Sequence, residues 1–129
     1  MRDINGLMSS LKKYLGWNKC RVSCFTNMLL SLFSVRTVNL HEMALAYNSK
    51  TQPLSRYRRL QRFLAYFEID FTVIARWIFN LCLADKENFY VIIDRTNWYV
   101  GRKKVNIFML AVAYEGIAIP LFWTMLDKA

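Results

Sequence analysis

The spacing of apolar residues changes once along this chain, and that change limits the folds open to it. Up to Leu83 the apolar residues recur at helical spacing, whereas from Phe89 onward they form short runs typical of strands. The charged stretch ADKEN (84–88) separates the two patterns. The sequence therefore predicts an α+β fold, with a helical region over residues 1–84 and a sheet region over residues 89–129.

Within these regions the pattern predicts individual elements. Helical patterns cover residues 7–33, 39–47, 54–67 and 68–83, and Asn39 is a plausible cap for the second of them. Strand patterns cover residues 89–93, 105–113 and 117–124, with turns at GRKK (101–104) and YEG (114–116). Phe89 to Ile93 is a nearly continuous apolar run, which predicts a strand covered on both faces and ending at Asp94. Pro120 predicts that the third strand lies at a sheet edge or contains a bulge.

The positive charge is concentrated in the first part of the chain. The formal net charge is +9, of which +8 belongs to residues 1–80. Such an excess favours a polyanionic partner, either nucleic acid or an anionic membrane surface. The apolar run from Val105 to Leu126 is interrupted by polar residues and by Pro120, so it indicates buried strands and not a membrane span. Three cysteines and a single histidine, His41, give weak support for zinc and are typical of unpaired thiols in a reducing compartment.

The segment LSRYRRLQRFLAYF (54–67) predicts an amphipathic helix with an arginine face. On a helical wheel Tyr57, Leu60, Leu64 and Phe67 share one side, and three arginines share the other. No Asp or Glu lies between Glu42 and Glu68, so the charge is of one sign. With the short helix before it, the segment resembles a helix-turn-helix unit, and we expect Arg56, Arg58, Arg59 and Arg62 to contact DNA phosphates. A solvated surface face and an amphipathic membrane helix are the other readings of this pattern.

Asp94 follows the apolar run directly, where an ionised carboxylate needs compensation. From the residues alone, an aspartate that ends a strand and caps a turn through Thr96 and Asn97 is the favoured interpretation. A metal ion or the neighbouring Arg95 are the alternatives.

A resemblance to a known family gives Asp94 a more specific meaning. The stretch YVIIDRTNWYVGRKKVNIFMLAVAYEGIAIPLFWTMLDKA (90–129) resembles the opening of the catalytic domain of a DDE-type insertion-sequence transposase, of the group named for insertion sequence four. The upstream LSRYRRLQRFL is similar to the helical segment before that domain, and the agreement begins near Thr37.

This resemblance implies a ribonuclease-H-like fold, whose first three strands form an antiparallel meander. It also implies an active site of two Asp and one Glu that binds divalent metal, with Asp94 as the first ligand and Mg²⁺ as the suitable ion. Lys103 and Lys104 then become candidates for phosphate contact near the site, and Trp98 and Tyr99 for stacking on a displaced base.

The chain departs from the family pattern after Asp94. The family's second Asp and its Glu signature have no counterpart, since Glu115 and Asp127 are the only later acids and neither matches. We therefore expect the amino-terminal piece of a bacterial, cytoplasmic transposase, which binds DNA at transposon ends (the terminal inverted repeats) without cutting or joining it. A homodimer is possible for the complete family member, and no membrane is expected. The alternatives are a DNA-binding remnant that competes for element ends and a small basic membrane-associated protein.

Overall fold

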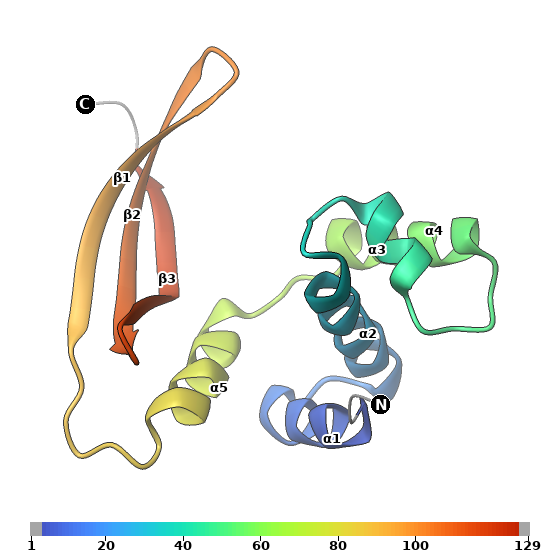
Figure 1. Cartoon of the computed structure of the whole chain (residues 1–129), viewed down its shortest axis with the longest axis horizontal. Coiled ribbons are helices and arrows are strands. Elements are labelled where there is room, and N and C mark those ends of the chain that lie inside the picture. Colours follow the sequence, from blue (N-terminus) through green and yellow to red (C-terminus); the bar gives the residue numbers. More distant parts are fainter. Residues whose placement is uncertain (1–3, 127–129) are drawn as a thin grey trace. The chain divides into compact units, whose positions relative to one another are not determined.

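The computed structural model describes residues 4–126, which form two compact units (Figure 1). The first unit, up to Ile69, contains four helices, and the second, from Asp70, contains one helix and a three-stranded antiparallel sheet. The predicted α+β order of helices followed by a sheet is confirmed. The two units divide at Ile69 and Asp70, which is earlier than the break expected at 84–88.

The first unit contains α1 (Ile4–Leu15), α2 (Lys19–Val35), α3 (Leu40–Ala46) and α4 (Pro53–Tyr66). The helical pattern over residues 7–33 forms two helices because Gly16, with φ 64°, lies in the left-handed region that ends a helix. Asn18 then begins α2 by accepting a hydrogen bond from the Arg21 backbone N–H at 2.9 Å. Asn39 caps α3 in the same way, as expected, by accepting from the His41 N–H at 3.0 Å.

An aromatic cluster joins α2 to α4. The ring of Trp17 lies 4.7 Å from that of Phe67, and the ring of Phe25 lies 6.1 Å from that of Phe63. Leu60 and Phe63 are the buried residues of α4, whereas Leu64 is 50% exposed. The apolar side of this helix is therefore rotated from the predicted one, because Phe63 and not Leu64 faces the other helices.

The second unit contains α5 (Phe71–Leu83), β1 (Val91–Val100), β2 (Lys103–Tyr114) and β3 (Ile117–Leu126). The sheet order β1-β2-β3 is the predicted antiparallel meander. Helix α5 covers one face of this sheet, and its Ala75 and Leu83 form a buried cluster with Val112 of β2 and Leu121 of β3. That packing places α5 with the sheet, even though its apolar pattern is helical like that of the segments before it.

Strand β1 differs most from its prediction. It does not end at Asp94 but continues to Val100, because each of its residues finds an antiparallel partner in β2. It is also an edge strand and is not covered on both faces: Val91 is 50% and Ile93 63% exposed. The following turn is shorter than GRKK, since only Gly101 and Arg102 lie outside the strands. Gly101 has φ 62° at the first turn position, as a two-residue hairpin turn requires.

The turn and the proline of the second hairpin agree with the sequence. Glu115 (φ 47°) and Gly116 (φ 81°) form the turn between β2 and β3, with positive φ at both central positions. Leu110 pairs with Phe122 and Ala111 pairs with Pro120, so β3 bulges between these pairs. The prediction of an edge or bulged strand around Pro120 is confirmed in both respects, and the bulge directs Leu121 into the core beneath α5.

Candidate nucleic-acid interface and the carboxylate of the first strand

The four candidate arginines of α4 do not have equivalent surroundings. Arg58, Arg59 and Arg62 are exposed, whereas Arg56 is half-buried. The Arg56 guanidinium donates to the backbone carbonyls of Ser49 and Thr51, at 2.7 Å each. Its hydrogen-bonding capacity therefore serves the loop between α3 and α4, which leaves the other three as the better phosphate contacts.

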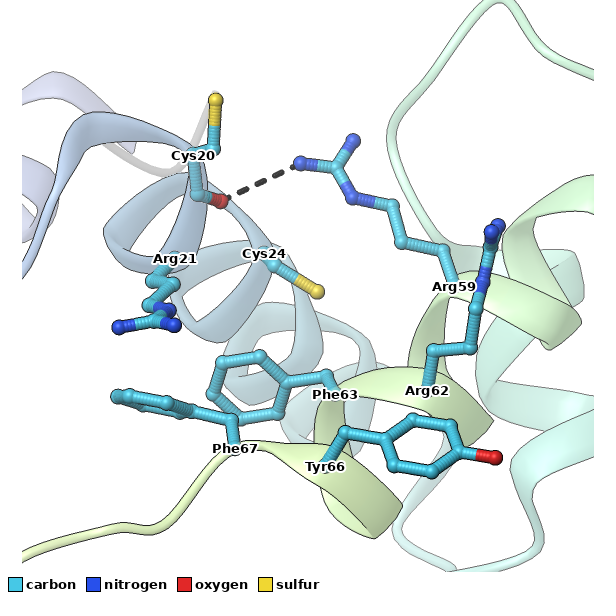
Figure 2. Close-up of a pocket in the computed structure, with 8 residues that line it drawn as sticks. All are labelled: Cys20, Arg21, Cys24, Arg59, Arg62, Phe63, Tyr66 and Phe67. Carbon is cyan, nitrogen blue, oxygen red and sulfur yellow. Dashed lines mark hydrogen bonds between the residues drawn. The ribbon is translucent and has the colours of Figure 1, made fainter.

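A pocket of about 270 Å³ opens between α2 and α4 (Figure 2). Its wall includes three arginines and three aromatic rings, and none of the acidic residues that the structure describes contributes to it. From α2 come Cys20, Arg21 and Cys24, and from α4 and the residue after it come Arg59, Arg62, Phe63, Tyr66 and Phe67. We call this site the arginine pocket.

Each guanidinium of the arginine pocket is held in place by a nearby group. Arg59 donates from Nη2 to the Cys20 carbonyl at 3.3 Å, and the Arg62 Nε donates to the Arg58 carbonyl at 3.3 Å. The guanidinium carbon of Arg21 lies 4.3 Å from the centre of the Phe67 ring, a cation–π distance. These contacts use only part of the donor capacity of each arginine, so N–H groups remain for an anion.

The buried Tyr47 beside Arg59 does not neutralise the positive charge of the arginine pocket. The guanidinium of Arg59 lies 6.0 Å from the centre of the buried Tyr47 ring. Burial, more than the nearby Cys24, raises the pKa of Tyr47 far above its usual value. The phenol is therefore neutral at physiological pH and places no negative charge beside Arg59.

The basic surface continues beyond the pocket. Arg58 and Gln61 line an adjoining hollow of about 340 Å³, and they share it with Arg62 and Tyr66 of the arginine pocket. Planar guanidiniums bind phosphate oxygens in a bidentate manner, and neighbouring aromatic rings offer stacking surfaces. The arrangement is chemically suited to phosphates, with room for an attached planar group.

The sequence interpretation missed the contribution of α2 to this site. Arg21 and Cys20 come from a helix that is separate in sequence from the arginine segment, whereas Tyr66 lies on the arginine side of α4, one turn after Arg62. The Trp17–Phe67 and Phe25–Phe63 ring contacts bring α2 to α4, and no local pattern specifies them. Two signals were present in the sequence: Arg21 lies in the basic first part of the chain, and Tyr66 lies four residues after Arg62 on the same helix face.

The structure places Asp94 in the middle of β1, opposite Met109, where its side chain is exposed. The Thr96 hydroxyl donates to Asp94 Oδ2 at 3.1 Å. Within residues 4–126 no three His, Cys, Asp or Glu side chains gather as a metal site would require. Asp127 lies outside the described residues. The carboxylate set does not fit Mg²⁺ as it stands, so metal binding at Asp94 stays a prediction that needs further ligands.

Lys103 and Lys104 lie at the start of β2, opposite Val100 and Tyr99, and both are exposed. Met109, the partner of Asp94, lies six positions after Lys103 along β2. At a rise of about 3.3 Å per residue this distance is about 20 Å. The structure therefore does not bring the two lysines to Asp94, and they form a separate basic site at the hairpin turn.

Two further observations bear on partners. No helix within residues 4–126 has the length and apolar character needed to cross a membrane. Comparisons with protein-family models, with curated proteins and with solved structures return no match, so the transposase resemblance stays a prediction.

Proposed function

We propose that this chain binds DNA through the arginine pocket and the adjoining exposed face of α4. The observation that carries the proposal is the convergence of Arg21, Arg59 and Arg62, from two helices, around a pocket that no acidic residue within 4–126 lines. Phosphate is the anion that DNA presents in a regular array, and arginine binds it through paired N–H groups. Most of the affinity then comes from the DNA backbone and little from base sequence.

The biological setting that we propose is an insertion-sequence transposase of the DDE type. The order of a helical basic part followed by an antiparallel meander is consistent with the start of a ribonuclease-H-like catalytic domain. The DNA would then be the transposon ends, in a bacterial cytoplasm. Strand cleavage is not part of the proposal, because within residues 4–126 no other carboxylates gather at Asp94 as metal-assisted transfer requires.

The test compares two variants that each lose two positive charges from exposed positions. Arg58→Gln/Arg62→Gln changes the proposed surface, and Lys12→Gln/Lys13→Gln changes α1. Binding of a labelled mixed-sequence duplex is followed by fluorescence anisotropy over a range of salt concentrations. We expect the arginine variant to weaken binding at least tenfold and to reduce the slope of log K against log salt by about 2, since each phosphate contact contributes about 0.9.

The lysine variant should change both quantities much less. Equal effects of the two variants would show that only total charge matters, and would refute a localised site. Binding of the wild-type chain to anionic vesicles, with no binding to duplex, would favour the membrane-associated alternative instead.

A further inference from the structure

The hairpin of β1 and β2 continues beyond β3 as a two-stranded ribbon. Leu126 of β3 pairs with Asn106, and among residues 4–126 the part of β1 and β2 past that pair has no further strand partner. Figure 1 shows this orange hairpin projecting past the end of β3. We call residues 98–105 the hairpin tip.

The hairpin tip carries exposed aromatic and basic side chains. Trp98 is 61% and Tyr99 69% exposed, and Arg102, Lys103 and Lys104 are exposed beside them. No acidic residue lies between Asp94 and Glu115. The strand register places Trp98 and Lys103 on one face of the ribbon and Tyr99 and Lys104 on the other. Each face therefore combines one aromatic ring with one cation.

These side chains do not serve the core of their unit. The buried cluster beneath α5 is built from Ala75, Leu83, Val112 and Leu121, and no residue of the hairpin tip packs against it. Trp98 instead forms one wall of an open hollow of about 360 Å³, together with Thr96, Ile107, Met109, Pro120 and Trp123. Two indole rings and a proline thus border a mainly apolar space, which suits the stacking of a planar aromatic ligand.

We propose that the hairpin tip and this hollow bind an unpaired base of single-stranded nucleic acid. Trp98 stacks on the base within the hollow, and Lys103, on the same face, binds the adjoining phosphate. Asp94 and Thr96 lie on this face too, farther from the turn. The negative charge of the Asp94 carboxylate repels phosphate, which favours a phosphate position beside Lys103. The inference rests on the proposed DNA-binding function and adds a second site with a different preference.

The position of the charges favours nucleic acid over a lipid surface. The apex of the tip is Gly101 and Arg102, followed at once by Lys103, while both aromatic residues lie behind it. Insertion into a bilayer would drive those cations into hydrocarbon before either ring arrived, which is unfavourable. A blunt duplex is also a poorer ligand, because its internal bases are stacked on both sides and only its two terminal pairs offer an open face.

The test uses the full chain with a labelled oligothymidylate of about twelve nucleotides and a blunt duplex of matched length. Trp98→Ala should weaken single-strand binding about tenfold, the usual effect of losing one stacked base, and should leave duplex binding within about twofold. Trp98→Phe should restore most of the affinity, because it retains a ring for stacking. Tyr90→Ala is the matched control, since Tyr90 is 79% exposed and precedes the opposite end of β1.

The outcomes separate this inference from the proposed function. If Trp98→Ala and Tyr90→Ala both leave single-strand binding unchanged, the hairpin site is overturned. Salt-sensitive duplex binding in the same experiment would still support the arginine pocket. A wild-type chain that binds neither DNA overturns both. Loss of anionic vesicle binding in Trp98→Ala, with single-strand affinity intact, would assign the tip to lipid and also overturn the inference.

Discussion

Arg56 offers a sharp test of the division between structural and DNA-binding arginines in α4. Its guanidinium donates to Thr51 O and Ser49 O at 2.7 Å each, and Nη1 lies 3.4 Å from the carbonyls of Ala44 and Leu45. The side chain therefore ties the end of α3 and the connecting loop to α4. Arg56→Ala removes these contacts and leaves the carbonyls to water.

The expected cost follows from the two short hydrogen bonds. A hydrogen bond from a charged donor contributes about 1.5–3 kcal/mol, and the partial exposure of the loop places each bond at or below the lower end. We therefore expect Arg56→Ala to lower the free energy of unfolding by about 2 kcal/mol. For a unit of this size a loss of about 1 kcal/mol lowers Tm by roughly 4–8 °C, so Tm should fall by roughly 10 °C.

Thermal and urea unfolding, followed by circular dichroism, measure this change. Arg58→Ala is the matched control, because the exposed Arg58 side chain makes no comparable contact with the loop, and its effect should stay below about 0.5 kcal/mol. Arg56→Lys should recover less than half of the loss, since one ammonium group cannot span both carbonyls. Folded Arg56→Ala protein should bind duplex DNA nearly as well as wild type.

Two results would refute the assignment of Arg56 to the loop. One is an Arg56→Ala variant that unfolds at the wild-type temperature. The other is a stable Arg56→Ala variant that loses as much DNA affinity as Arg58→Gln/Arg62→Gln, which would make Arg56 a phosphate contact after all.

Two further predictions concern the cores of the two units. Leu121→Ala should destabilise the sheet unit by about 2–4 kcal/mol in urea unfolding, because the bulge directs this side chain, 8% exposed, beneath α5. Leu126→Ala, at a site 38% exposed on the same strand, should cost much less. Equal losses of stability in the two variants would contradict this packing. The raised pKa of Tyr47 means that the folded state favours the neutral phenol, so its contribution to stability is complete below the unfolded value of 10.0 and is lost as pH rises above it. Unfolding measured across pH 9–11 should show this loss in wild type and not in Tyr47→Phe, and a decline of equal size in both would remove Tyr47 as its cause.

Much of the fold follows from local patterns that the sequence states directly. The Asn39 cap, the α4 segment and the Glu115–Gly116 turn depend on hydrogen bonds between residues close in sequence. The change from helices to strands is visible in the spacing of apolar residues along the chain. These features could be predicted because neighbouring residues suffice to specify them.

The candidate site was only partly predictable for the opposite reason. The sequence supplied the arginines of α4, but it could not show that Arg56 is occupied by loop carbonyls or that Arg21 joins Arg59 and Arg62. Both facts depend on how separate segments pack. The position of Asp94 is a similar case, since pairing with β2 carries β1 past the polar residues where an isolated strand would have ended.

The sequence by itself determined the element types, most of their bounds and the concentration of positive charge in the first part of the chain. Only the tertiary structure decided that α5 packs with the sheet, that β1 is an exposed edge and which cations gather around one pocket. The physical reason is the distance along the sequence over which each interaction acts. Backbone hydrogen bonding and side-chain periodicity act between near neighbours. Burial and charge clustering, in contrast, are properties of surfaces that form when distant segments meet.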